Sequence, residues 1–240
     1  MDNAIYAALT RQSGLMREMR TVANNMANSS TTGFRREGVV FSEYMSPLAN
    51  RGAGRETLSM ANARGREVDL TPGSLTMTGG SLDLALEQGG FFMVETPQGN
   101  RLTRAGAFLL SPEGEITNAD GYRVLDEGGA PIAVPPGTRS LGVGPDGTLS
   151  ADGQPVGRIG VFDQPDRAKL THEGGTLFSA EGAEPMPDAV VRQGFLEDSN
   201  VNPVLEIARM IEVQRAYELG QSFLEGEDQR IRAAIAATTR

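Results

Sequence analysis

Few residues of this chain have types and spacings that could support catalysis. His172 is the single histidine and cysteine is absent, so neither a Ser-His-Asp triad nor a His- and Cys-based zinc site can be assembled. Glu173 and two glycines follow His172, which predicts a solvated loop. Acidic residues are abundant, yet nothing singles out a pair as acid and base for hydrolysis. We therefore expect no enzyme activity, no metal site and no cofactor.

Two glycine-containing patterns match ligand-binding motifs only in part. Residues 142–147 (GVGPDG) have the spacing of the dinucleotide fingerprint G-x-G-x-x-G. The Pro-Asp-Gly at their end predicts a hairpin turn, whereas the fingerprint needs a helix to receive a pyrophosphate. The Asp-Gly pairs elsewhere lack the alternating ligands and the final glutamate of a calcium loop. Neither pattern predicts a binding site.

The overall charge and composition exclude further classes of protein. The chain has 240 residues and a formal net charge of −9, which argues against sequence-independent binding of nucleic acid. No run of 18 apolar residues is present, so no transmembrane helix is predicted. The first residues lack a basic segment followed by an apolar run, so we expect no cleaved secretory signal. A chain of this size can bury a core in one large domain or two modest ones.

The N-terminal segment, residues 3–28, has the periodicity of an amphipathic helix. Asp2 or Asn3 is a suitable N-cap, and the polar residues that lead to Gly33 predict the helix end. Its apolar stripe follows spacings of three and four, with Gln12 as one polar member: Ile5, Ala8, Gln12, Leu15, Met19, Val22 and Met26.

The C-terminal segment, residues 202–237, predicts a second amphipathic helix. Asn202 is the expected N-cap and Pro203 suits the first helical position. Glutamates and arginines at helical spacing add small ion-pair support. The apolar positions are Val204, Ile207, Ala208, Met210, Ile211, Tyr217, Leu224, Ile231 and Ile235.

Neither terminal helix is expected to be stable alone. Burial of about ten apolar side chains gives on the order of 15–30 kcal/mol, and ordering about 25 residues costs a similar sum. Gly14, Gly220 and Gly226 each cost about 1 kcal/mol relative to alanine. We therefore expect part of the termini to be disordered in the free monomer and to fold on assembly. The alternative is that the two helices pair within one chain.

The middle of the chain predicts β-structure. From Val68 to Gly194, turn dipeptides such as Asp-Gly and Gly-Gly separate short apolar or alternating runs. Residues 46–66 have neither period and predict a flexible connector. The predicted class is α+β, with discontinuous, coiled-coil-like terminal helices and a central all-β domain of short antiparallel strands. We expect a helical assembly domain from 1–33 and 200–240, an extended connector at 34–67, and a β-rich domain at 68–199.

Four ordered blocks carry a specific resemblance. Residues 23–35 (ANNMANSSTTGFR) are similar to the signature of flagellar rod and hook proteins, and residues 81–94 (SLDLALEQGGFFMV) resemble a second block of that family. Residues 102–108 (LTRAGAF) and the C-terminal segments 193–202 and 210–218 match the third and fourth. The chain is thus identified as a member of the flagellar basal-body rod and hook family. Its opening residues and its length favour the proximal rod subgroup over the distal one.

The resemblance implies a structural rod subunit that transmits torque and is not an enzyme. Such a chain would leave the cell unfolded through the flagellar type III export apparatus, and would stack axially with copies of itself and other rod subunits in the periplasmic part of the basal body. Neither nucleic acid nor a membrane-spanning role is implied. The residues expected at the assembly interface are Ile5, Leu15, Met19, Val22, Asn24, Asn25, Ala27, Asn28, Thr31, Gly33, Phe34, Asn200, Val204, Ile207, Ile211, Arg215 and Tyr217.

Two alternatives remain open at this point. One is the distal rod protein of the same family. The other is a β-domain that binds glycan or peptidoglycan while the termini only dimerise. For the turn after the first helix, an ordinary helix C-cap and a contact with neighbouring subunits are compatible. If Gly33 needs positive φ there, Gly33→Val should cost about 1–2 kcal/mol and impair assembly.

Overall fold

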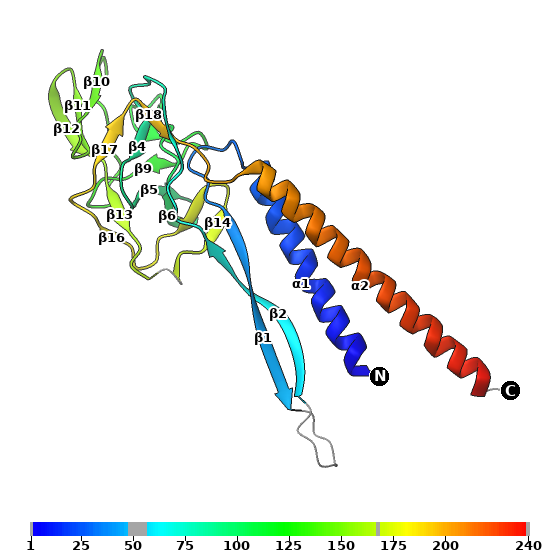
Figure 1. The fold of residues 1–240 in the computed structure, drawn as a ribbon. Coiled ribbons are helices and arrows are strands. Elements are labelled where there is room, and N and C mark those ends of the chain that lie inside the picture. The colour runs from blue at the N-terminus through cyan, green and yellow to red at the C-terminus, as the bar shows by residue number, and fades with distance from the viewer. Residues whose placement is uncertain (1, 48–56, 167–168, 239–240) are drawn as a thin grey trace. The chain divides into compact units, whose positions relative to one another are not determined.

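The chain forms two compact units, each built from separate stretches of sequence. The computed structural model describes residues 2–47, 57–166 and 169–238 (Figure 1). Unit 1 contains Met1–Ala27, Glu37–Glu67 and Asn202–Arg240. Unit 2 contains Asn28–Arg36 and Val68–Val201. The chain therefore passes between the units several times, and neither unit is continuous in sequence.

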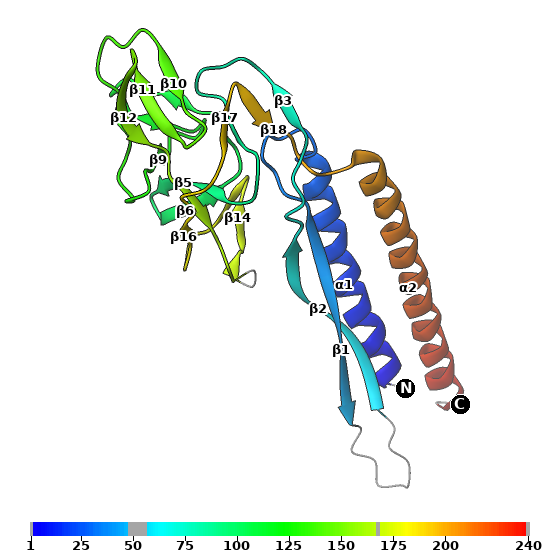
Figure 2. The ribbon, with the colours of Figure 1, turned by 60° about the vertical axis from the view of Figure 1, so that its left-hand side comes forward.

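Two long helices form most of unit 1. Helix α1 spans Asp2–Ala27 and helix α2 spans Pro203–Thr238. The side chain of Asn202 caps α2, because its Oδ1 accepts hydrogen bonds from the N–H groups of Val204 and Leu205 at 3.0 and 3.3 Å. The two helices lie side by side in both views (Figures 1 and 2). Of the two arrangements that the sequence left open, pairing within one chain is the one observed.

A two-stranded sheet completes unit 1. Strand β1 (Glu37–Pro47) pairs with strand β2 (Thr57–Val68), and β1 also contacts α1. Both strands come from the segment 34–67 that the sequence assigns to a connector. The part of that segment at residues 48–56 lies outside the described residues.

Unit 2 consists of short strands joined by tight turns. Its largest sheet has nine strands: β14-β15-β6-β5-β9-β8-β7 in order, with β13 beside β5 and β16 beside β13. Smaller sheets are formed by β10-β11-β12, β17-β4 and β18-β3, and the registered pairs are antiparallel. The bounds are β3 (Leu75–Met77), β4 (Leu84–Leu86), β5 (Phe91–Thr96), β6 (Gly99–Thr103), β7 (Leu109–Leu110), β8 (Ile116–Thr117), β9 (Arg123–Val124), β10 (Leu141–Val143), β11 (Thr148–Ala151), β12 (Gln154–Arg158), β13 (Val161–Asp163), β14 (His172–Gly174), β15 (Leu177–Ser179), β16 (Glu184–Pro185), β17 (Val191–Gln193) and β18 (Phe195–Glu197).

The core of unit 2 lies around the central strand β5. Alternate residues of β5 enter two hydrophobic clusters, Phe92 and Val94 on one side and Phe91 and Met93 on the other. This is expected for a strand with both faces covered. The rings of Phe92 and Phe108 meet edge to face, with centroids 5.2 Å apart. The predicted α+β class, with terminal helices and a central domain of short antiparallel strands, is confirmed.

Two local predictions have different outcomes. Residues 142–147 do form a hairpin turn, between β10 and β11, with Gly147 N–H donating to the carbonyl of Gly144 at 2.9 Å. The prediction of a solvated loop for His172 is wrong, because this residue lies in β14 and is half-buried. Its ring meets Phe34 and Phe178 edge-on, at centroid distances of 5.8 and 5.2 Å. Aromatic contact on two sides removes much of the imidazole from water.

Across the described ranges, no helix combines the length and the apolar character that a membrane span requires.

Candidate assembly interface

Polar contacts fix the alignment of α1 against α2 in unit 1. Gln12 Nε2 donates a hydrogen bond to the carbonyl of Tyr217 at 2.8 Å. A Cβ at Gly220 would lie 2.5 Å from that same amide nitrogen, so the glycine leaves room for this bond. Further along, Arg209 Nε donates to Oε1 of the buried Glu18 at 2.7 Å. These contacts hold the register between two helices that are far apart in sequence.

Asn25 connects three elements of unit 1. Its amide forms a reciprocal pair with the backbone of Glu37, because Nδ2 donates to the Glu37 carbonyl at 2.8 Å and Oδ1 accepts from the Glu37 N–H at 3.0 Å. Nδ2 also lies 3.3 Å from Oε2 of Glu206 in α2. Asn25, Glu37 and Glu206 are each 1% exposed. An amide is suited to this position because it donates and accepts in one plane.

The remaining face of α2 is apolar and exposed in its N-terminal half. Val204, Ile207 and Ile211 are 73%, 48% and 44% exposed, and their spacing places them on one side of the helix. Among the described residues of α2, Val213 is the one hydrophobic side chain that is fully buried. Arg215 continues the exposed side one turn further. A helix with so little of its apolar surface covered is suited to packing against additional helices.

A groove between the two helices adds to this surface. It has a volume of about 580 Å³ and is lined by residues of both helices, including Leu15, Gly220 and Phe223. Leu219 is 73% exposed and Phe223 is 47% exposed at its edge, and Tyr6 and Leu9 of α1 are exposed as well. Unit 1 therefore presents apolar side chains from both helices.

The turn after α1 belongs to unit 2. Gly33 adopts φ of +70°, and its N–H donates to the carbonyl of Glu197 at 2.7 Å. A Cβ at Gly33 would lie 2.3 Å from the backbone nitrogen of Ala105, so no side chain fits there. Phe34 is fully buried, and the N–H of Thr31 donates to the carbonyl of Asn28 at 3.1 Å. The turn is therefore held against the β-rich unit of the same chain.

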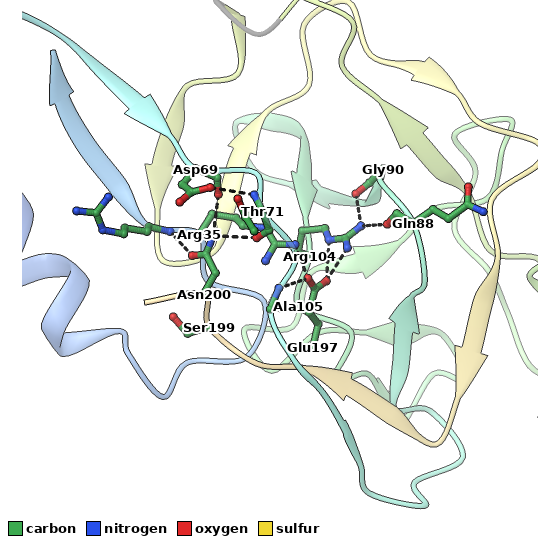
Figure 3. Close-up of polar contacts among 12 residues, drawn as sticks. Arg35, Asp69, Thr71, Gln88, Gly90, Arg104, Ala105, Glu197, Ser199 and Asn200 are labelled. Carbon is green, nitrogen blue, oxygen red and sulfur yellow. Dashed lines mark hydrogen bonds and ion pairs between the residues drawn. The ribbon is translucent and has the colours of Figure 1, made fainter. Parts of the chain in front are cut away.

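The carboxylate of Glu197 is the centre of a buried polar network in unit 2 (Figure 3). Oε1 is paired with Arg35 Nη2 and accepts from the N–H of Gly73 at 2.9 Å. Oε2 accepts from Nε and Nη2 of Arg104 at 2.8 and 2.7 Å. The three charged side chains are at most 3% exposed. Buried charges are expected to be paired and hydrogen-bonded, and this network meets that condition except at Nη1 of Arg35, which is buried without a hydrogen-bond partner.

Backbone carbonyls accept further hydrogen bonds from the buried guanidinium of Arg104. Its Nη1 donates to the carbonyls of Gln88 and Gly90 at 3.0 and 2.6 Å. Burial lowers the pKa of Arg104 to about 10, while the negative charge of Glu197 acts in the opposite direction. Arg104 therefore stays charged at neutral pH.

The side chain of Asn200 forms hydrogen bonds with two other segments of unit 2, one at Arg36 and one at Asp69 and Thr71 (Figure 3). Its Oδ1 accepts from the N–H of Arg36 at 2.7 Å, and its Nδ2 donates to the carbonyls of Asp69 and Thr71 at 2.9 Å each. The N–H of Asp69 in turn donates to the carbonyl of Arg36 at 2.8 Å. Segments that enter and leave unit 2 are thus joined at one place.

The residues predicted for the interface fall into two groups. Those exposed on the surface of the described chain are Ala27, Val204, Ile207, Ile211 and Arg215. Those buried or half-buried by contacts within the chain are Ile5, Leu15, Met19, Val22, Asn24, Asn25, Asn28, Thr31, Gly33, Phe34, Asn200 and Tyr217.

Sequence reasoning missed Glu197 and Arg104 as the centre of a buried polar network. Both lie inside the blocks that carry the family resemblance, at 193–202 and 102–108. One signal could have identified them. Glu197 follows Phe195 by two positions and Arg104 follows Leu102 by two, and in a strand residues two apart lie on the same face. Nothing in the sequence shows that these two residues meet across 93 positions.

Comparison with known proteins agrees with these blocks. Residues 5–35 match the profile described as flagella basal body rod protein, residues 85–151 the D1 domain of the flagellar hook protein FlgE/F/G, and residues 192–237 the C-terminal region of the flagellar basal body rod FlgEFG proteins. The chain is 38% identical to the flagellar basal-body rod protein FlgF of Caulobacter vibrioides, over 98% of this chain and 97% of that one. Identity to FlgF of Mesorhizobium japonicum is also 38%, over 91% and 90%. FlgG of Bacillus subtilis is 28% identical, over 98% of each chain.

The chain belongs to the family of flagellar basal-body rod proteins. Within that family it is FlgF-like along nearly its whole length. By this membership it is a structural subunit of the rod, and its place in the cell is the flagellar basal body.

The buried network generates a prediction about the stability of unit 2. Glu197→Ala leaves two guanidinium groups buried without their carboxylate, and we expect it to lower the free energy of unfolding by about 3–5 kcal/mol. Urea unfolding followed by circular dichroism measures this change. The matched control is Glu87→Gln, which removes an exposed partner of Arg192 and should leave the transition nearly unchanged. Equal effects of the two variants would contradict the assigned role of Glu197.

The geometry of Gly33 generates a second prediction. Gly33→Val adds a clash with the backbone at Ala105 to the φ strain of about 1–2 kcal/mol, so we expect loss of the turn and impaired motility. Gly129→Val is the control, because Gly129 has φ of +81° and open space around its Cβ position. Swarming and thermal unfolding of both variants should separate strain from the clash. Wild-type motility of Gly33→Val would show that the close approach is unimportant.

Proposed function

We propose that this subunit assembles axially through the exposed apolar face of unit 1, with copies of itself and with other rod subunits, and that the resulting rod transmits torque. The observation that carries this proposal is the exposure of Val204, Ile207 and Ile211, which the described chain leaves largely in contact with water. Burial of the parts of these three side chains that are still exposed, between 44% and 73% of each, would contribute about 2–5 kcal/mol in total. A face that packs on a different face of the next copy builds an open helical assembly when the rotation between copies does not close a ring.

The distribution of charge supports association through unit 1. Unit 2 has 19 acidic and 10 basic residues, a formal charge of −9, whereas unit 1 has 12 of each and is neutral. Contact between the β-rich units of two copies would bring like charge together, which is unfavourable. The helical unit carries no such penalty.

A route of export to the rod is part of the proposed function. Export in an unfolded state by the flagellar type III apparatus would deliver it to the periplasmic part of the rod. The zero cysteine count is compatible with such a route. The proposed role is mechanical and involves no catalytic residue. Similarity to FlgF over nearly the whole chain supports the proximal rod subgroup, with the distal rod protein as the alternative.

Electron microscopy of basal bodies from an in-frame deletion strain is the decisive test. We expect basal bodies that stop short of a complete rod, restored by the full-length gene but not by one that lacks residues 1–30. Intact rods and hooks in the deletion strain would contradict the proposal. In that case the glycan-binding alternative for the β-rich unit would become the leading one.

A sharper variant tests the assembly face directly. Ile207→Glu combined with Ile211→Glu places two charges on an exposed surface, so we expect a stably folded monomer that fails to restore rods. The control is Gln229→Glu, an exposed position in the C-terminal half of the same helix. Circular dichroism of the purified chains checks the fold, and microscopy of complemented strains checks assembly. Normal rods with the double variant would mean that this face is not an interface.

A further inference from the structure

The nine-stranded sheet of unit 2 ends in an exposed apolar strand. Strand β7 is last in the strand order and pairs with β8 through Leu109 opposite Thr117 and Leu110 opposite Ile116. Within the described ranges, β8 is its only strand neighbour. Leu109 and Leu110 are 58% and 46% exposed. An exposed hydrophobic edge of this kind is a template for pairing with another strand.

The backbone of β7 is oriented for such pairing. The N–H of Ser111 donates to the carbonyl of Glu115 at 2.8 Å, so Ser111 and Leu109 turn their backbone groups toward β8. In an antiparallel ladder the residue between two such positions directs its N–H and carbonyl away from the partner strand. Leu110 therefore presents one donor and one acceptor at the open side of the sheet.

A large groove lies beside this strand. It has a volume of about 810 Å³, and β7, the turn that follows it and the hairpin at residues 117–123 contribute to its lining, with Tyr122 among the lining side chains. This places apolar surface, open backbone groups and concave space in one part of unit 2. Peptides that bind by strand addition use this combination.

The groove is strongly acidic. Glu95, Glu113, Glu115 and Asp120 line it, against a single cation, Arg123. Arg123 is already paired with Glu95 at 2.7 Å and with Glu115 at 3.5 Å. In the part of the chain that the structure describes, neither Glu113 nor Asp120 forms an ion pair, and both are exposed. The lining therefore has a formal charge of −3, with two carboxylates available to a ligand.

We propose that β7 and this groove form a docking site for an extended segment of a different protein, in which basic residues alternate with apolar ones. Alternation suits a strand, because successive side chains point to opposite faces, so that apolar residues on one face cover the leucine of β7 on that face while basic residues on the other face reach the acidic rim. The β-rich unit of a second copy is disfavoured as the occupant, because each unit 2 carries a formal charge of −9. The site lies in unit 2 and does not depend on assembly through unit 1.

The test uses the full-length chain and a fluorescent peptide of four lysines alternating with three valines. Fluorescence anisotropy should show binding that weakens with added salt. For the variant Glu113→Gln with Asp120→Asn, we expect the dissociation constant to rise about three- to tenfold, the range for losing two exposed ion pairs. The matched control is Glu181→Gln with Asp188→Asn, two exposed acids of unit 2 outside the groove, which should change it by less than about twofold.

A second peptide separates strand addition from simple attraction of charge. It has the same sequence and charge, but its alternate backbone amides are methylated, so it cannot pair with Leu110. Loss of binding by this peptide supports the proposal. Equal binding of both peptides, or equal weakening by both double variants, would overturn it. Dimerisation of the full chain that is abolished by Leu110→Asn would also overturn it, because the occupant would then be a second copy.

Discussion

The carboxylate of Glu197 is the group on which much of the β-rich unit depends. It accepts from two arginines and one backbone N–H, and the carbonyl of the same residue receives the N–H of Gly33. One residue therefore joins the turn after the first helix, strand β18 and the segment around Arg104. Because these charges are out of water, the arrangement tolerates little displacement, since a lost partner leaves a buried charge uncompensated. The glycine at position 33 is part of the same constraint, as the backbone of Ala105 occupies the space of its missing side chain.

The two units differ in how much of their apolar surface they bury within the chain. Unit 2 buries two hydrophobic clusters and a network of charged side chains around Glu197. Unit 1 aligns its helices through Gln12, Glu18 and Asn25 but leaves Val204, Ile207 and Ile211 in water. In the proposed assembly, contact with neighbouring subunits would bury these side chains and favour the ordered helices.

Much of this fold could be predicted from the sequence because its signals are local. The period of residues 3–28, the Asn202–Pro203 cap and the Gly-punctuated strands each depend on neighbours a few positions away. The positive φ of Gly33 was also predictable, since it follows a polar helix end. The same local signals do not predict contacts between residues that are far apart in sequence. The aromatic surroundings of His172 and the meeting of Glu197 with Arg35 depend on which strands pair, and no local pattern determines that. For the same reason, helix periodicity identified Leu15 and Ile211 alike as apolar, but could not distinguish the one buried within the chain from the one exposed.

The interleaved composition of the two units has a consequence for the order of folding. Unit 1 needs α2 to cover α1, and unit 2 needs Glu197 to neutralise Arg35 and Arg104, so both wait for the last part of the chain. Contacts between residues so distant in sequence form slowly, because the loop between them must close first. A chain that enters a narrow channel with its N-terminus first would thus carry no segment able to complete either unit on the way. The topology of the chain alone therefore delays completion of both units until residues near 200 are available to fold.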